Sequence, residues 1–589
     1  MKLLKLLTAV LPIVVAGAFS MPASGAGPAG LQGNSAYAGS GTANGVTNVF
    51  ATTQKTSCYT PEVQYFTSNG PTDGYTGMSA CNGAGNTGEN PGPYPSQAGS
   101  NAGYPASSPM LVKDHSESDI RVDPTNPNHV IATSKWFVSA EGYNHILGFY
   151  ESFDGGATWP VQGHVPGYEG WTDNTDPVGA FDSFGNFYFL DLPYQFYYTS
   201  DGGHNFQVNQ NKEPNPVVPA EVISVAVRPH GSTTATQWVT THNGHPDYVA
   251  PYDAKGLEPD KQWITIDTNP SSPFFNRIYA LWAVFSGCCT SRTYSSYAQA
   301  FADGTHSDWS TPLLLPDGSN NPQGVSYVLP HVDPDGVLYT PLTNTAPSKG
   351  YCCDKITMIK SSDGGASWSI TSVVADNIAV PPGRFPNTTF RDGIETTFTL
   401  GPQKVNGRYP LYVAYEDYGT GFDNVALVAS YDGGTSWTAP TVVNDNSSPA
   451  DEFQPNLAAA ANGTVSVNFY DRRLPCPAAG TAEAAAAGLA LESLPPYGAT
   501  NYCINASVQF FRANLQRVGH NIRLSQHAFD PQLNSPHTSC ATCTGTFIGD
   551  YFGNTFSSST NFSTFVSTYN DGSNPNHYQQ QVVATLAIP

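Results

Sequence analysis

The sequence predicts an all-β fold and, within that class, a β-propeller built of four-stranded blades. Short segments of alternating apolar and polar residues recur along most of the chain, each bounded by glycine or proline turns. An Asp-Gly-Gly turn accompanies several of them, and the unit of strands and turns repeats about every 50 to 70 residues. Charged residues are only 12% of the chain, against about 25% in ordinary soluble proteins, which leaves few residues for the wet faces of long helices. Repeated short strands of this kind favour a radial propeller.

The first 26 residues have the pattern of a secretory signal peptide. Lys2 and Lys5 precede an apolar run from Leu6 to Phe19, and small residues follow as far as Ala26. The apolar run is too short to span a membrane as a helix. We therefore expect a secreted protein, extracellular, periplasmic or on the cell surface, with no membrane insertion.

The rest of the chain divides into an arm and the repeats. Residues 27–115 are rich in Gly, Ser, Asn and Pro and lack periodicity, which predicts an extended N-terminal arm. Residues 116–589 form the propeller, and counting strand units favours seven blades. Six or eight are the alternatives, because the long step from Asp201 to Asp303 has room for an insertion or a further blade. The seven blades are expected near 119–165, 175–225, 260–315, 325–375, 390–443, 453–520 and 546–589.

The recurring turn has a physical basis in its residues. In Ser152-Phe-Asp154-Gly-Gly-Ala-Thr-Trp159 the aspartate can accept hydrogen bonds from the backbone of its own turn, and glycine supplies positive φ. The aromatic residue then packs under the hairpin. Similar turns contain Asp201, Asp363 and Asp432, and a degraded copy contains Asp303.

The motif S-x-D-x-G-x-x-W resembles the Asp-box, or bacterial neuraminidase repeat, of the sialidase-like propellers. The resemblance extends over about residues 116–589. It implies that the turns lie at the blade periphery, away from the pocket. Asp154, Asp201, Asp363 and Asp432 are therefore expected to be structural.

Ten cysteines in an exported chain predict structural disulfides. Cys476 and Cys503 bracket an Ala-rich insertion and are expected to close its neck. The sequence alone does not determine the other pairings. The remaining candidates are Cys58 with Cys81, the vicinal pairs Cys288-Cys289 and Cys352-Cys353 with each other, and Cys540-x-x-Cys543.

The net charge argues against two classes of partner. With 24 Lys and Arg against 46 Asp and Glu, the chain carries −22. Nucleic-acid binding needs clustered Lys and Arg for the phosphates, and anionic membranes attract basic segments. We expect neither partner, and we expect a monomer that binds carbohydrate or a cell-surface glycan.

A propeller gathers the starts of its innermost strands around a central funnel, and polar residues recur at those starts here. Such a ring suits a sugar or polyol, with carboxylates for acid–base chemistry. The same carboxylates would suit a divalent cation, although no cofactor is required. The expected catalytic residues are Asp119, Asp176, Asp392, Asp550 and Tyr551. The expected substrate-binding residues are Arg121, Asp260, His331, Arg391, Glu452 and Gln454.

Two functional hypotheses follow. The resemblance implies a glycoside hydrolase, and a true sialidase would need three arginines that clamp the substrate carboxylate together with a Tyr/Glu nucleophile pair and an acid/base Asp. The candidates Arg121, Arg391 and the Arg472-Arg473 pair do not match the sialidase spacing, so sialidase activity itself is disfavoured. The alternative is a non-catalytic propeller that binds glycan or protein.

Two further motifs allow a chemical and a structural interpretation. His242-x-x-His245-x-Asp247 has metal-ligand residue types, but a loop without metal is favoured. The run Asp471-Arg472-Arg473 at a strand end is expected to form salt bridges at a blade junction.

Overall fold

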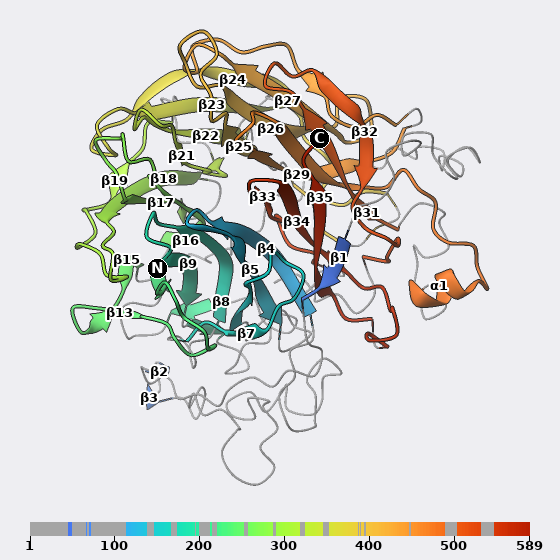
Figure 1. Ribbon diagram of the computed structural model, residues 1–589, viewed down its shortest axis with the longest axis horizontal. Coiled ribbons are helices and arrows are strands. Elements are labelled where there is room, and N and C mark those ends of the chain that lie inside the picture. The colour runs from blue at the N-terminus through green and yellow to red at the C-terminus, as the bar shows by residue number, and fades with distance from the viewer. Residues whose placement is uncertain are drawn as a thin grey trace, which may run out of the picture.

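The structure of the chain is a computed structural model. Seven antiparallel sheets are arranged around a central axis, in sequence order from the blue N-terminal blade to the red C-terminal one (Figure 1). The fold is thus an all-β propeller of seven blades, as the sequence predicted. The structure describes residues 45–49, 66–67, 70–71, 114–137, 146–166, 173–194, 196–198, 212–214, 221–252, 257–286, 290–317, 324–345, 353–386, 388, 390–393, 396–446, 449–488, 503–531, 547–575 and 577–589.

The first three blades each run from the axis outward along the chain. Blade 1 consists of β4 (Asp114–Asp123), β5 (Asn126–Phe137), β6 (Ile146–Ser152) and β7 (Val161–His164). Blade 2 consists of β8 (Asp173–Phe181), β9 (Phe187–Tyr194), β12 (Glu221–Arg228) and β15 (Tyr248–Tyr252). Blade 3 consists of β16 (Leu257–Ile266), β17 (Arg277–Ser286), β18 (Thr290–Gln299) and β19 (Leu313–Leu314).

Blades 4 to 6 repeat the pattern. In blade 4 the inner strand is interrupted, so β20 (Gly324–Ser326) and β21 (His331–Val332) both pair with β22 (Leu338–Thr345), followed by β23 (Cys353–Ser361) and β24 (Ser369–Ala379). Blade 5 consists of β25 (Thr397–Leu400), β26 (Leu411–Asp417), β27 (Asn424–Ser430) and β28 (Thr441–Val442). Blade 6 consists of β29 (Glu452–Ala459), β30 (Val465–Asp471), β31 (Asn505–Phe511) and β32 (Arg517–Arg523).

Blade 7 takes strands from both ends of the chain. It contains β33 (Asn554–Phe556), β34 (Thr560–Ser567) and β35 (Gln580–Ala587), and its outermost strand is β1 (Gly45–Asn48). Gly45 pairs with Thr585 and Asn48 with Val582, so the blue β1 lies beside the red β35 (Figure 1). Part of the segment that the sequence placed in an arm therefore completes a blade, because Val46 and Thr47 are β-branched and suit a strand.

The remaining elements are short. Three two-stranded ribbons and one helix lie outside the blade sheets. They are β2 (Phe66–Thr67) with β3 (Gly70–Pro71), β10 (Phe196–Tyr198) with β11 (Lys212–Pro214), β13 (Thr241–His242) with β14 (His245–Pro246), and α1 (Ala482–Ala486). No helix in the described ranges is long and apolar enough to cross a membrane. Next to α1, the predicted disulfide Cys476–Cys503 is confirmed, and the other cysteine pairings fall outside the described residues.

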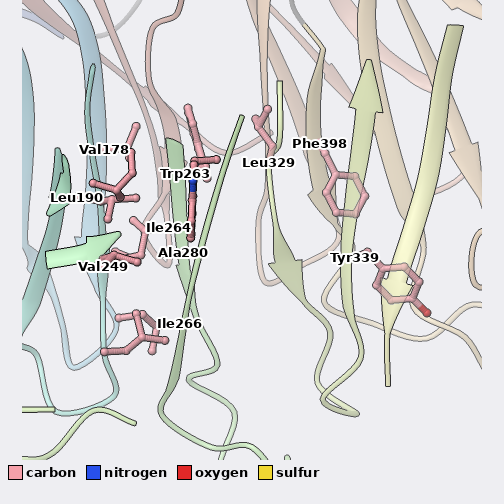
Figure 2. Packing of buried hydrophobic residues seen from close by; sticks show 14 of the residues in the cluster. Val178, Leu190, Val249, Trp263, Ile264, Ile266, Ala280, Leu329, Tyr339 and Phe398 are labelled. Carbon is pink, nitrogen blue, oxygen red and sulfur yellow. The ribbon is translucent and has the colours of Figure 1, made fainter. Parts of the chain in front are cut away.

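The core lies between the faces of neighbouring blades. Figure 2 shows Val178, Leu190 and Val249 of blade 2 facing Ile264, Ile266 and Ala280 of blade 3, with Leu329, Tyr339 and Phe398 of the next two blades beyond them. Both faces of each sheet are covered, so strands such as β12 and β30 are buried along their whole length. This packing explains why the strands contain so many Val, Ile and aromatic residues.

The recurring Asp-Gly-Gly turns share one hydrogen-bond pattern between the third and fourth strands of their blades. In blade 1 the hydroxyl of Ser152 donates to Asp154 (2.9 Å), which also accepts from the backbone N–H of Thr158 (2.8 Å). Equivalent bonds surround Asp363 (2.8 and 2.9 Å) and Asp432 (2.8 and 2.9 Å). Asp201 lies outside the described residues. Each of these described aspartates therefore accepts hydrogen bonds within its own turn.

Candidate active site at the propeller axis

The innermost strands share a backbone feature at the point where they reach the axis. Five non-glycine residues have positive φ there: Glu117 (50°), Asp176 (57°), Lys261 (52°), Tyr327 (56°) and Gln454 (49°). Four of them sit at register shifts of β4, β8, β16 and β29, and Tyr327 lies between β20 and β21. A bulge redirects a side chain, and left-handed backbone at a bulky residue costs about 1–3 kcal/mol. Its recurrence marks this ring as a candidate site.

A cavity on the axis is lined by residues from six blades. Its wall combines one carboxylate, one ammonium group, two phenols, an indole and amides, so both apolar and polar groups face the same space. The lining residues are Asp176, Lys261, Gln262, Trp263, Tyr327, Val328, Leu329, Thr396, Thr397, Pro455, Asn456 and Tyr551.

Asp550 is held between two cations from other blades. Lys261 Nζ lies 2.5 Å from its carboxylate, and Arg391 donates to it through Nε (3.0 Å) and a terminal nitrogen (2.5 Å). Burial opposes ionisation of Asp550, but Arg391 and Lys261 outweigh it and lower its pKa. Asp550 is thus an anion that ties blades 3, 5 and 7 together at the axis.

Asp176 and Asp260 form a hydrogen-bonded carboxyl pair from adjacent blades. Burial, together with the charge of Asp176, raises the pKa of Asp260 to about 7. The pKa of Asp176 moves the other way: burial raises it, but Lys261 and Lys135 lower it overall. Thr175 supports Asp176 by donating to it (2.5 Å). One proton is therefore shared by this pair near neutral pH.

Tyr551 and Glu117 complete the inner ring. The hydroxyl of Tyr551 donates to the carbonyl of Pro177 (3.2 Å), and its ring meets Trp263 edge to face at 5.6 Å. Burial, then the charges of Glu117 and Asp176, raise the pKa of Tyr551, so it is a neutral phenol. Burial, then Asp176, also raise the pKa of Glu117, whose carboxylate lies 3.7 Å from Lys135.

Asp119 and Arg121 bind each other at the junction of blades 1 and 2. Their side chains form an ion pair of 2.8 Å. Asp119 accepts from the backbone N–H of Gly179 (3.0 Å), and Arg121 donates to the carbonyl of Gly179 (2.9 Å). Burial, then Arg121, lower the pKa of His331 to about 4. This group connects blades rather than lining the cavity.

Beside the axis, between blades 5 and 6, the structure assembles a second group of carboxylates. One oxygen each of Asp392, Glu416 and Asp423 lies within 4.8 Å of the others. Asp451 and Glu452 lie next to them, since the backbone N–H of Asp423 donates to Asp451 (3.1 Å) and that of Glu452 donates to the carbonyl of Asp423 (3.0 Å). We call these five residues the blade 5–6 cluster. The sequence indicated Asp392 and Glu452 but missed Asp451, which directly precedes β29, and missed Glu416 and Asp423, which lie on or before the second and third strands of blade 5.

Gln454 joins this cluster to the axis. Its backbone N–H donates to Glu416, and its side chain donates to the carbonyl of Gly549 (2.8 Å), next to Asp550. Of the predicted substrate-binding residues, Gln454 and Glu452 are both buried. Arg391, by contrast, has a side chain that is 44% exposed.

The two motifs outside the funnel have structural partners. Arg472 binds Asp451 (2.6 Å), and Arg473 binds Asp471 (2.8 Å) and Asp445 (2.6 Å), which confirms the predicted salt bridges between blades. His242 instead pairs with Asp308 (2.7 Å), and Asp247 pairs with His306 (2.7 Å). Within the described residues, His242, His245 and Asp247 are not brought together as a ligand set.

Comparisons with known proteins add little. No family model matches the sequence, and no curated protein matches it. Similar solved structures include the polysaccharide lyase Uly1 (10% identity, TM-score 0.43, 83% of this chain and 93% of that chain) and the Hadza microbial sialidase Hz136 (11%, 0.35, 81% and 66%). A protein of unknown function from Dyadobacter fermentans DSM 18053 also aligns (10%, 0.40, 81% and 95%). Likenesses this weak carry no argument about the activity of this chain.

Proposed function

We propose that this chain is a secreted glycoside hydrolase whose acid–base group is the Asp176–Asp260 pair. The observation that carries the proposal is geometric: Asp176 of blade 2, which lines the axial cavity, is hydrogen-bonded to Asp260 of blade 3. In this pair the pKa of Asp176 is lowered and that of Asp260 is raised to about 7. A carboxyl group with a pKa near the working pH can both release and recover a proton during turnover. Tyr327, Tyr551 and Trp263 in the cavity wall are suited to pack against a sugar ring.

In the proposed reaction the pair acts as the general acid. Asp176 lines the cavity and Asp260 is not among the lining residues, so the proton of the pair passes through Asp176 to the glycosidic oxygen as the bond from that oxygen to the anomeric carbon breaks. Water adds to the anomeric carbon, and the proton it loses returns to the pair. The two carboxyl groups are hydrogen-bonded, so they are too close to flank the bond as separate acid and nucleophile, and they act as one unit.

The charges around the cavity favour a neutral sugar over an anionic one. Arg121, Arg391 and Arg472 each bind an aspartate of this chain. A sialic acid carboxylate would therefore have to displace one of these aspartates before any arginine could clamp it.

The test is turnover of a panel of fluorogenic neutral glycosides and a sialoside between pH 4 and 9. For the Asp260→Asn variant we expect kcat to fall about 100-fold or more and the activity loss centred near pH 7 to disappear. Asp191→Asn is the matched control: Asp191 is a buried aspartate whose pKa is raised to about 8 by burial, but it accepts from the hydroxyl of Ser224 in its own blade instead of pairing with a second carboxyl group. Full activity of Asp260→Asn would overturn the assignment.

The second candidate is a glycan-binding propeller without catalysis. The ion pairs of Asp550 with Lys261 and Arg391 favour this candidate, because these ion pairs stabilise the ring of blades and give the three side chains a structural role that involves no reaction. Absence of turnover across the panel, together with glycan retention that Tyr327→Ala weakens, would support this candidate instead.

A further inference from the structure

We propose that the blade 5–6 cluster binds a divalent cation of the Ca²⁺ type through Asp392, Glu416 and Asp423. This inference does not depend on the proposed hydrolase activity. The three carboxylates come from one blade: Asp392 precedes β25, Glu416 lies on β26 and Asp423 precedes β27. Blade 6 closes the site from the other side with Asp451 and Glu452.

The first argument is that the cluster is buried but not neutralised by hydrogen bonds. Asp423 is 0% exposed, and no described residue donates a well-formed hydrogen bond to either of its carboxylate oxygens, although the backbone N–H of Asn424 lies close enough to favour its ionised form. Both carboxylate oxygens of Asp392 and one of Glu452 are likewise buried without a hydrogen bond. A buried carboxylate without partners costs several kcal/mol, so the fold needs something to balance it.

The second argument is that the nearby arginines do not supply that balance. Arg472 is bound to Asp451 and to the carbonyl of Pro386 (2.9 Å). Arg473 is bound to Asp471 and Asp445. Both guanidinium groups thus bind other aspartates directly. Arg472 acts on Asp392 only through its charge, and no described side chain donates a hydrogen bond to Asp392 or Asp423.

Protonation is the competing way to relieve the cluster. Burial, then neighbouring carboxylates, raise the pKa of Asp392 and of Asp423. A bound cation would favour the ionised forms, so its binding should release any protons that these groups hold.

The donor atoms select the kind of cation. All are carboxylate oxygens, which suit hard ions rather than zinc or copper. One oxygen of each of Asp392, Glu416 and Asp423 lies within 4.8 Å of the others, so a single ion can contact all three. A buried set of several protein carboxylates suits Ca²⁺ better than Mg²⁺, which usually keeps several waters and binds only one or two carboxylates. The oxygen of Glu452 that is buried without a hydrogen bond is a further candidate ligand.

The cation would also support the axis. Asp392 directly follows Arg391, which covers Asp550, and Gln454 connects Glu416 to the carbonyl of Gly549. Cation binding at the cluster would thus hold in place Arg391, which contacts Asp550, and Gly549, which adjoins it. The cation would position the axial residues and would take no part in the reaction.

The test is calorimetric titration of chelator-treated full-length protein with CaCl2 or MgCl2, with bound metal counted by mass spectrometry. We expect one Ca²⁺ per chain, a higher Tm and proton release. Asp423→Asn and Asp392→Asn should each weaken Ca²⁺ binding at least tenfold, while the control Asp191→Asn should not change it.

Two results would overturn the proposal: no Ca²⁺ binding at millimolar concentrations, or unchanged binding in Asp423→Asn. An equal rise in Tm with Mg²⁺ would overturn the choice of ion. Loss of binding is distinguished from misfolding because Asp423→Asn in chelator should unfold at a Tm no lower than wild type. A lower Tm there would mean that Asp423 serves the fold itself and would also count against the site.

Discussion

The axial ring and the blade 5–6 cluster are both acidic, but they balance their charges differently. At the axis, Asp550 has Lys261 and Arg391 as direct partners. In the blade 5–6 cluster, by contrast, no described side chain donates a hydrogen bond to the carboxylate oxygens of Asp392 or Asp423. Their pKa values accordingly move in opposite directions, down for Asp550 and up for Asp423.

The difference shows that counting acidic residues does not locate a site; their partners do. A carboxylate between two cations contributes to the stability of the ring. A buried carboxylate without partners opposes stability unless a ligand is bound. The Asp176–Asp260 pair lies between these extremes, because the two groups share one proton.

The largest expected effect is at the axis. Asp550→Ala leaves Lys261 and Arg391 without their anion, so we expect the free energy of unfolding to fall by about 3–5 kcal/mol, measured in urea. The surface pair Lys404–Asp335 is the control, since both side chains are over 40% exposed, and Asp335→Ala should cost less than about 1 kcal/mol. If both variants lost the same free energy of unfolding, the buried ion pairs of Asp550 would contribute no more than a surface ion pair.

The pH dependence of stability should separate the two regions. The pKa of Asp550 is lowered by folding, so its contribution is present above the unfolded value of about 4 and is lost as pH falls below it. The pKa values of Asp392 and Asp423 are raised by folding. Their contribution to the free energy of unfolding is therefore present below about pH 4 and is lost as the pH rises.

In chelator we therefore expect stability to decline from weakly acidic to alkaline pH, by up to about 1.4 kcal/mol per pH unit for each proton lost. Added Ca²⁺ should remove this decline. Thermal unfolding across pH 4 to 9, in chelator and with added Ca²⁺, measures both profiles. A Tm that does not change with pH in chelator would contradict the claim that the carboxylates of the cluster lack a counterion.

The smallest effect is expected at a peripheral turn. Asp432→Ala removes the acceptor for the backbone of its own turn, and because the site is exposed the cost should be about 1 kcal/mol or less. Activity should not change, because the turn is outside the cavity lining. A lower kcat in this variant would link the turns to the site.

Much of the fold was predictable because its signals are local. Most of the seven expected blades match the seven sheets to within a few residues, since each turn and each alternating strand depends on neighbouring residues. Blade 2 is the exception, because its outer strand β15 ends at Tyr252, well beyond the expected end at residue 225. Asp176 and Asp550, which the sequence placed at the starts of inner strands, both have Lys261 beside them in the structure, and Asp260 pairs with Asp176. The pairing of β1 with β35 was not predictable, because it joins segments more than 500 residues apart.

The sequence by itself thus determined a turn-rich β-propeller and the positions at which polar groups approach its axis. Only the tertiary structure decided which of these groups became partners. Bulges in the inner strands redirect Asp176, Lys261 and Gln454 toward residues of other blades, and Glu416 and Asp423 reach the rim from strands with no such signal. Burial and the distance between charges set the chemistry of a carboxylate, and both depend on segments that are remote along the chain.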